Sequence, residues 1–376
     1  MPRLRYFLPL LLLTLATASA SSQNSGFYLE CPTTTFFRDA EFFMPFTKGY
    51  TASGFRLQPT VNYLSTDSNV TISAGVLLTG IAGVDGLWKV QPVVTIDYRP
   101  ARWVELTMGT LHGSLEHKMP APLYNPERWI YSYQENGLQI RTATKHWESD
   151  TWVDWEHFLE PWTPDQERFT LASRHLLTLL GDADGKCMLQ LPAAFSGSHR
   201  GGQFTTLDTC IETLMNEYAG LSLSYNACKT TTLTAEAPIF LYQNLSPTPH
   251  THYLNGYALY PSLVMNISLP ARAAGDKSRA TKELTLRLGF WQAHHYQSAR
   301  GSYLYQCVSW HDPLFQTPER HMLTADIAAT AKQRGGLGIT LNASIYHDLD
   351  LKKTDMVIGL AMQIAPRVAL SNTAKQ

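Results

Sequence analysis

The chain has 376 residues, enough for one large β domain or two domains of ordinary size. Its 30 Lys and Arg residues nearly balance 31 Asp and Glu residues, which argues against a general nucleic-acid binder because such proteins carry a basic surface. Only 16% of the residues are charged while 11% are aromatic, which indicates that much of the surface does not face water.

The N-terminus has the three parts of a secretory signal peptide. Arg3 and Arg5 precede an apolar run from Tyr6 to Ala16, and the small residues Ala18-Ser19-Ala20 follow. We therefore expect residues 1–20 to be a signal peptide that is cleaved after Ala20. A transmembrane anchor is the alternative, but the run is shorter than the roughly 17 residues needed to cross a bilayer.

Beyond residues 21–39, which we expect to form an N-terminal periplasmic segment or latch, apolar and polar residues alternate. In NVTISAGVLLTG, Val70 and Ile72 fall on one face of a strand while Thr71 and Ser73 fall on the other. Such stretches are about 10 residues long, and at about 3.3 Å per residue and a tilt of about 45° each rises roughly 23 Å. This matches the apolar band of an outer-membrane barrel, about 25 Å tall.

Connections between these strands alternate between short turns and long loops, as in outer-membrane barrels with short periplasmic turns and long extracellular loops. We predict an all-β fold, a transmembrane antiparallel β-barrel at residues 40–370, with a C-terminal tail at residues 371–376. If the first strand lies near Ala40–Lys48, the count is about 16 strands; 14 is the second choice. The best candidate for a helix is Thr206–Tyr218, in one of the long loops.

Several stretches carry a resemblance to known proteins: TFFRDAEFFMPFTKGYT, PLYNPERW, ENGLQI, TWVDWEHF and SHRGGQ. With them the chain resembles the porin-like outer-membrane β-barrels of Gram-negative bacteria, and more narrowly a group of uncharacterised barrels of similar length. The resemblance implies a cell outer-membrane location, outer-membrane lipid as a partner and help from the barrel-assembly machinery during biogenesis. A homotrimer is one assembly that it suggests.

The strand TWVDWEHFLEP places carboxylates opposite large apolar groups. In a barrel, Trp155 would face lipid while Asp154 and Glu156 would face a wet lumen, where a carboxylate keeps its hydration. The neighbouring strand supplies Arg141 and Lys145 to its inner face. Further lumen candidates are Arg56, Arg287 and His295. These charges either brace one another across the wall or select solutes.

The loop from His112 to Glu135 is long, with three prolines and charges of both signs. Loops of this length are usually functional or disordered. In many sixteen-stranded porins the third long loop folds inward, so the resemblance implies a constriction. Its candidates are Glu116, His117, Lys118, Glu127 and Arg128. The alternative is an ordinary exposed loop.

We expect no cofactor and no metal site. The pair His294-His295 invites a metal interpretation, but adjacent strand residues point to opposite faces. Material for a catalytic triad exists in Ser222, Ser224, Asp208, His199 and His311, yet no G-x-S-x-G motif occurs. We therefore expect a protein that is not an enzyme, with a barrel hydrolase as the alternative.

The function predicted from the sequence is a passive, porin-like channel for small hydrophilic solutes. One alternative is a closed or plugged barrel that serves as a binding or assembly scaffold, which bulky lumen candidates such as Trp152, Phe158 and Trp291 favour. Another is a soluble, secreted β-sandwich that binds or cleaves carbohydrate.

Overall fold

The computed structural model describes residues 26–160, 162, 165–181, 185–202, 211–247, 253–270, 281–312, 314–332 and 336–370. The expected signal peptide, the expected C-terminal tail and Asp208 lie outside these residues. Among the described residues, no helix is both long enough and apolar enough to cross a bilayer.

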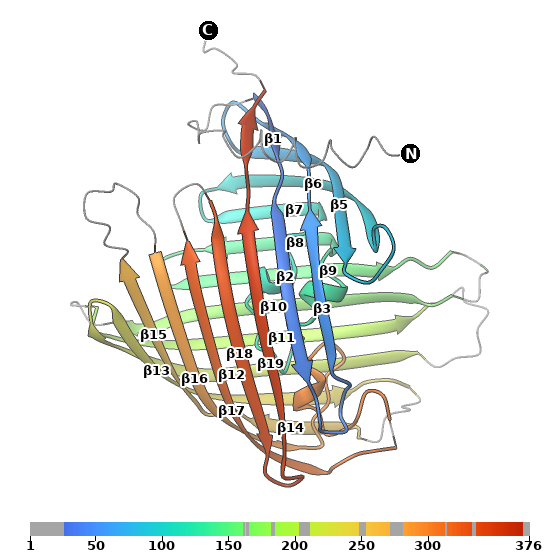
Figure 1. Ribbon diagram of the computed structural model, residues 1–376, viewed down its shortest axis with the longest axis vertical. Helices are drawn as coiled ribbons and strands as arrows, with labels where there is room; N and C mark the ends of the chain where they lie inside the picture. Colours follow the sequence, from blue (N-terminus) through green and yellow to red (C-terminus); the bar gives the residue numbers. More distant parts are fainter. Residues whose placement is uncertain are drawn as a thin grey trace.

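Antiparallel strands make up most of the described chain (Figure 1). The segments are β1 (Gly26–Glu30), β2 (Thr33–Glu41), β3 (Tyr50–Leu57), β4 (Thr60–Leu64), β5 (Val70–Ile81), β6 (Lys89–Ala101), β7 (Val104–Thr110), β8 (Asn136–Ala143), β9 (Trp147–His157), β10 (Glu167–Gly181), β11 (Cys187–Gly201), β12 (Glu212–Cys228), β13 (Thr231–Asn244), β14 (Asn255–Leu259), β15 (Ser262–Pro270), β16 (Thr281–His294), β17 (Glu319–Lys332), β18 (Gly338–Asp348), β19 (Lys353–Ile364) and β20 (Arg367–Ala369).

Four of the breaks between segments contain a proline. Pro32 separates β1 from β2, Pro59 separates β3 from β4, Pro261 separates β14 from β15, and Pro366 separates β19 from β20. Proline has no N–H and cannot donate to the ladder, so it interrupts a strand without redirecting it. Each pair of segments continues as one strand, which confirms the predicted barrel of 16 strands.

The barrel closes where its first strand meets its last (Figure 1). Asp39 of β2 pairs with Ile358 of β19, and Leu29 of β1 pairs with Val368 of β20. A sheet that closes on itself leaves no edge strand exposed. The alternative of a secreted β-sandwich is therefore wrong, because a sandwich needs two separate sheets.

The first strand begins earlier than the sequence suggested. β1 and β2 occupy most of the segment expected to be a latch, and residues 42–49 form the loop before β3. The carboxylate of Asp355 accepts hydrogen bonds from the backbone N–H groups of Phe43 and Met44, at 2.6 and 2.9 Å. These bonds hold the chain out of the ladder where a strand was expected.

The prediction of a helix at Thr206–Tyr218 is also wrong over the residues that the structure describes. From Glu212 onward the chain is the strand β12, whereas residues 206–210 lie outside the description. Leu214 and Asn216 are buried inside the barrel, so the segment follows the two-residue repeat of a strand.

Side chains alternate between the inside and the outside of the wall. In β6, Val93 and Thr95 are 2% and 6% exposed, whereas Val94 and Ile96 are 55% and 43% exposed. The period of two residues therefore assigns each side chain to the lumen or to the outer wall.

Two long loops fold into the barrel and form what we call the plug: residues 111–135, between β7 and β8, and residues 295–318, between β16 and β17. The Tyr296 hydroxyl of the second loop donates to the Pro122 carbonyl of the first at 3.0 Å. The helical turns in the plug are η1 (Ser114–His117), α2 (Arg128–Tyr131) and η2 (Tyr303–Tyr305).

The plug touches the wall in every direction. Ile130 packs into an apolar cluster on β2 and β3, His117 bonds to Asp150 of β9, and the ring of Tyr305 lies 5.9 Å from that of Tyr346 of β18. Further hydrogen bonds join the plug to β6, β8, β10, β12 and β17 through His112–Asp97, His112–Gln139, Arg300–Thr170, Gln297–Asn216 and Leu304–Arg320. Protein therefore occupies the lumen next to the long loops.

Candidate functional site

Five of the residues that the sequence suggested for the lumen lie on strands, and all five contact the plug or a charged neighbour on the wall. Glu156 pairs with Arg300 of the plug, and Arg287 pairs with Glu236 of β13, both at 2.5 Å. The first pair joins the plug to the wall, and the second joins β13 to β16 across the intervening strand β15. The five are Arg56 of β3, Arg141 of β8, Asp154 and Glu156 of β9, and Arg287 of β16.

Arg56 has an unusual environment. Its guanidinium carbon lies 5.3, 4.7 and 4.2 Å from the ring centroids of Phe36, Trp129 and Tyr133. Among the described residues, none accepts a hydrogen bond from its Nε or Nη2 atoms. The aromatic faces therefore supply the stabilisation that a buried cation needs, and they tie the plug to β3.

Lys145 and His295 do not lie on inner strand faces as the sequence suggested. β8 ends at Ala143 because the Thr144 N–H bonds to the Trp147 carbonyl and closes a turn, which leaves Lys145 exposed. His295 follows the last residue of β16 with φ of 53°, so the chain leaves the sheet there. Its ring stacks on that of Tyr253 at 4.0 Å.

The five constriction-loop candidates all lie in the plug. Glu116 and His117 belong to η1, Lys118 follows it, and Glu127 and Arg128 lie where α2 begins. Four of their five partners on the wall lie on the neighbouring strands β8 and β9, and the fifth lies on β2. The partners are Arg141, Asp150, Glu148, Arg38 and Asp154, respectively.

The tightest contact between plug and wall surrounds His117, which is fully buried. Its Nδ1 lies 2.8 Å from Asp150 of β9 and its Nε2 lies 2.7 Å from Glu135 of the plug. Tyr124 donates a further hydrogen bond to Glu135. The ring of His117 stacks on Trp152 with centroids 3.5 Å apart.

The contacts around His117 favour a charged imidazole and a charged Glu135 carboxylate. Burial lowers the pKa of His117, but the hydrogen bonds to Asp150 and Glu135 outweigh it and raise the pKa overall. Burial likewise raises the pKa of Glu135, but the bond from His117 outweighs it and lowers the pKa. An imidazolium held by two carboxylates has no free nitrogen to accept a proton. His117 therefore serves as a structural cation.

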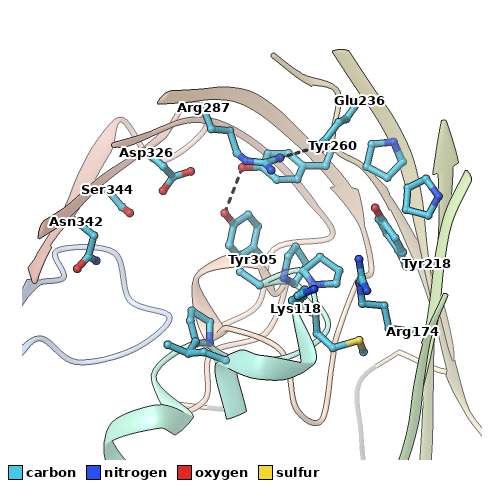
Figure 2. Close-up of a pocket in the computed structure, with 18 of the residues that line it drawn as sticks. Lys118, Arg174, Tyr218, Glu236, Tyr260, Arg287, Tyr305, Asp326, Asn342 and Ser344 are labelled. Atoms are coloured by element: carbon cyan, nitrogen blue, oxygen red, sulfur yellow. Dashed lines mark hydrogen bonds and ion pairs between the residues drawn. The ribbon is translucent and has the colours of Figure 1, made fainter. Parts of the chain in front are cut away.

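A cavity of about 690 Å³ lies between the plug and the short-turn end of the barrel (Figure 2). The hydroxyls of Tyr260 on the wall and Tyr305 on the plug are 3.4 Å apart across it. Beside them, the Arg287–Glu236 ion pair faces the cavity. Other lining residues are Lys118, Arg174, Gln190, Tyr218, Ser222, Asp326, Thr340, Asn342, Ser344, Tyr346 and Gln363.

The sequence analysis singled out Arg287 but not the tyrosines or Glu236 and Asp326. A signal exists for the acidic pair, since TAEAPIF and TADIAAT each place one carboxylate in an alternating, otherwise small or apolar run. The tyrosines carry no such signal, because an aromatic residue in a barrel strand fits either the lumen or the outer wall.

The residues considered for a triad that the structure describes do not come together, and Asp208 lies outside them. Ser222 lines the cavity, Ser224 bonds to Thr234, and His199 bonds to Thr213 on the outer wall. Two Ser–His contacts do occur: Ser173 with His175 at 2.9 Å and Ser309 with His311 at 3.4 Å. Neither histidine has a carboxylate partner among the described residues, and both serines are buried.

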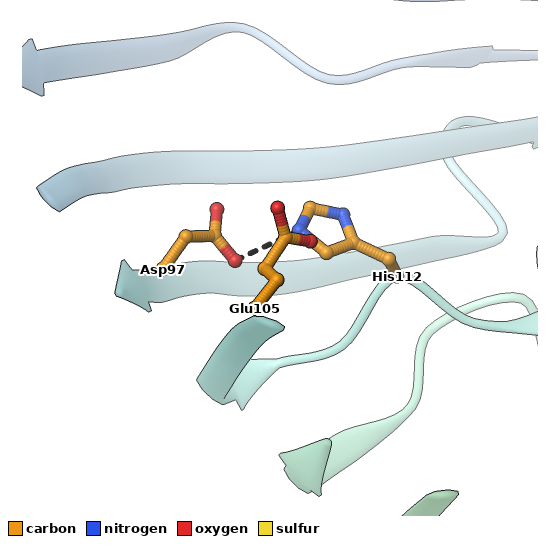
Figure 3. Close-up of side chains that lie close together, drawn as sticks. All are labelled: Asp97, Glu105 and His112. Atoms are coloured by element: carbon orange, nitrogen blue, oxygen red, sulfur yellow. Dashed lines mark hydrogen bonds and ion pairs between the residues drawn. The ribbon is translucent and has the colours of Figure 1, made fainter. Parts of the chain in front are cut away.

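In the part of the chain that the structure describes, one group of side chains has the donor set for a metal ion: Asp97 of β6, Glu105 of β7 and His112 of the plug (Figure 3). The ligand atoms lie within 4.8 Å of one another, and carboxylate oxygens with an imidazole suit several divalent ions. However, His112 Nε2 already lies 2.9 Å from Asp97, and Arg99 lies 2.5 Å from Glu105. Ion pairs therefore explain why these side chains lie close together without a metal ion.

A second hollow is a groove on the outer wall near the long-loop end, over β2, β3, β5 and β19, with a volume of about 590 Å³. Gly80 keeps it open, since a Cβ atom there would lie 2.4 Å from the ring of Phe55. Just beyond its long-loop end, two residues along the strands from the lining residues Phe37 and Ser53, the Thr51 hydroxyl donates to Asp39 at 2.6 Å. Its apolar lining includes Phe37, Phe55, Val84, Leu360 and Met362.

A closed 16-strand barrel with an apolar outer face and inward-folded loops defines an outer-membrane β-barrel protein. The family model of the lipid A 3'-O-deacylase type matches residues 19–373, so the chain belongs to that family. Its place is the cell outer membrane, with the short turns on the periplasmic side.

Solved structures share the fold. A loop L8 deletion mutant of OmpT, an outer membrane protein of Vibrio cholerae, is 7% identical with a TM-score of 0.50, covering 91% of this chain and 100% of that one. OccK5 (OpdH) of Pseudomonas aeruginosa is 11% identical with a TM-score of 0.50, covering 92% and 99%. At these identities the likeness concerns the fold alone. No curated protein matches the chain.

Proposed function

We propose that the protein acts on a lipid A-type glycolipid of the outer leaflet and cleaves an acyl ester at the outer-wall groove. The observation that carries this proposal is the groove itself. It is apolar, it faces the lipid, and polar side chains lie at its long-loop end. The family match supports the class of substrate. The proposal follows the alternative of a barrel hydrolase rather than the expectation that the protein is not an enzyme.

The groove suits an acyl chain with its ester at one end. It lies near the long loops and so at the level of the outer leaflet. Phe37, Leu360 and Met362 are 44%, 40% and 43% exposed along it, which offers apolar contact to a hydrocarbon chain. The hydroxyls and carboxylate of Ser53, Thr51 and Asp39 lie at the end nearest the headgroups.

Asp39 is the group at this end that can serve as a general base. Its carboxylate already accepts a hydrogen bond from the Thr51 hydroxyl, at 2.6 Å. A water held in the same way would lose its proton to Asp39 as its oxygen attacks the ester carbonyl carbon. The ester C–O bond then breaks, the fatty acid leaves, and the sugar oxygen takes up the proton.

The test compares lipid A from Gram-negative cells that make the wild-type protein, the Asp39→Asn variant or no protein. Mass spectrometry should show the loss of one acyl chain with the wild type and at least a hundredfold less product with Asp39→Asn. Asp67→Asn, in an exposed turn at the periplasmic end, is the matched control and should retain activity. Lipid A of unchanged mass in cells with folded wild-type protein would contradict the proposal.

A second candidate function is the binding of a small hydrophilic ligand in the cavity below the plug, in keeping with the plugged-barrel alternative. The observation that favours it is the polar and tyrosine-rich lining, which offers ring faces and hydrogen bonds together. The plug argues against the passive channel expected from the sequence. Conductance in a planar bilayer separates the two, since a plugged barrel should give no steady current whereas a passive channel should.

A further inference from the structure

The periplasmic end of the barrel carries exposed cations. Arg102 lies in the turn between β6 and β7, Lys145 in the turn between β8 and β9, and Lys229 in the turn between β12 and β13. All three are exposed, and none forms an ion pair with any residue that the structure describes. The same holds for three further cations at this end, which are Lys186, Lys282 and Lys332.

Acidic residues are fewer in the described parts of these turns, and they are engaged or face elsewhere. Asp67 accepts hydrogen bonds from Ser65 and Asn69 within its own turn. Glu283 follows Lys282 directly, so the two-residue repeat places it on the other face of the wall. In sequence, the turn residues 182–184, 271–280 and 333–335, which lie outside the description, add three acidic and four basic residues. The periplasmic end is therefore cationic as a whole.

Aromatic side chains on the outer wall show that these cations lie at the membrane surface. Tyr98 of β6, Trp147 of β9 and Tyr225 of β12 lie near the periplasmic ends of their strands and are 45%, 40% and 48% exposed. Tyrosine and tryptophan are enriched where the hydrocarbon of a bilayer meets the headgroups. The cations of the adjoining turns follow or precede these rings within four residues in the sequence. They therefore lie at the level of the lipid headgroups.

Lys282 occupies the same level on another part of the wall. Arg287 of the same strand lines the cavity, whereas Leu288 is 63% exposed, so the even-numbered residues of β16 face lipid. Lys282 ends this outward row and pairs with the exposed Leu269 of β15. A lysine in this position can keep its methylene groups in hydrocarbon while its ammonium group reaches the headgroups. Lys332 lies diagonally beside it in the ladder between β16 and β17.

We propose that these cations form a periplasmic rim that binds the headgroups of anionic phospholipids in the periplasmic leaflet. An ammonium or guanidinium group donates charge-assisted hydrogen bonds to phosphate oxygens. A headgroup such as phosphatidylglycerol offers a net negative charge, whereas the phosphate of a zwitterionic lipid is neutralised by its own cation. The rim therefore prefers the anionic lipid. It consists of Arg102, Lys145, Lys186, Lys229, Lys282 and Lys332.

The long-loop end offers matched lysines in a different electrostatic setting. Lys48 shares the loop between β2 and β3 with the exposed Glu41. Lys352 and Lys353 follow the exposed Asp350 between β18 and β19. All three lysines are exposed, as those of the rim are. Their acidic neighbours leave these loops without an excess of positive charge, so we expect them to contribute little to the choice of lipid.

Spin-labelled phospholipids test the rim in vesicles of phosphatidylcholine that contain the full chain. At low salt, the wild type should immobilise labelled phosphatidylglycerol about threefold more strongly than labelled phosphatidylcholine. Salt at about 1 M should remove most of this preference because it screens charges beyond about 3 Å. The rim variant Lys145→Gln with Lys229→Gln and Lys282→Gln should lose roughly half of the preference or more. The control Lys48→Gln with Lys352→Gln and Lys353→Gln removes the same charge and should keep it.

Heat-modifiable migration on a gel shows that each variant is folded. A wild type without preference for phosphatidylglycerol, or an equal loss of preference in the rim variant and the control, would overturn the proposal. Sedimentation with purified peptidoglycan tests the other partner that a cationic periplasmic surface could meet. If the rim variant lost binding to peptidoglycan while its lipid preference stayed that of the wild type, the cations would serve the cell wall, which would also overturn the proposal.

Discussion

The imidazole of His117 lies flat against the indole of Trp152, with ring centroids 3.5 Å apart and planes within 6°. This contact joins the plug to β9, and Asp150 of the same strand bonds the imidazole edge at 2.8 Å. The charged ring is thus held by an aromatic face and two carboxylates. The first loop of the plug is fixed to the wall by a buried ionic centre.

Replacing His117 should therefore loosen the plug. In His117→Gln, Glu135 and Asp150 lose their shared cation, and breaking a buried pair in this way costs about 3–5 kcal/mol. We expect the temperature at which the heat-modifiable folded band disappears to fall by several degrees. Lys118→Gln is the control, because its pair with Glu148 is exposed and contributes at most about 1 kcal/mol. Equal thermal stability of the two variants would show that the centre does not anchor the plug.

The same centre predicts a dependence on pH. The pKa of His117 in the folded protein is raised above its ordinary value of 6.5, despite burial, by its bonds to Asp150 and Glu135. The stabilisation is thus fully present below about pH 6.5 and is lost as the pH rises through the raised pKa. Cleavage of the plug after Lys118 and Arg128 by trypsin should become faster as the pH rises above the pKa of His117. The variant His117→Gln should lose this increase in cleavage rate with pH, whereas His112→Gln should keep most of it.

The alternation in VQPVVTIDYRP separates Val94 and Ile96 from Thr95, and their exposure shows the first two on the outer wall and Thr95 in the lumen. The number of strands and the closure of the barrel can be predicted from such local repeats because each spanning strand needs an apolar outer face. The residue at which the first strand ends cannot be predicted in this way. It depends on hydrogen bonds from Phe43 and Met44 to Asp355, which lies more than 300 residues away in the sequence.

The sites were harder to predict than the strands. Alternation tells which side of the wall a residue faces but not what it meets there, so the contacts of His117 with Asp150 and Trp152 could not be inferred. The second loop of the plug carries no repeat that sets it apart from an exposed loop.

The buried pair Arg320–Asp348 predicts a strong coupling between two strands and the plug. Arg320 donates to Asp348 at 2.9 and 3.0 Å and to the carbonyls of Leu304 and Gln306 at 2.8 and 2.7 Å. Arg320→Met leaves a buried carboxylate and should cost about 3–5 kcal/mol. Arg320→Met with Asp348→Asn should cost clearly less than the sum of the single changes. Additive losses of unfolding free energy in this double-mutant cycle would contradict the coupling.

Removing part of the plug should turn the closed barrel into a pore. Thr110 pairs with Asn136, so a short Gly-Ser turn can replace residues 113–134 without stretching β7 or β8. We expect steady currents across a planar bilayer for this variant and none for the wild type, because the deletion removes the protein that fills this side of the lumen. Shortening the loop at residues 82–87, outside the lumen, is the control and should give no current. A folded deletion variant that stays silent would mean that the loop at residues 295–318 seals the lumen by itself.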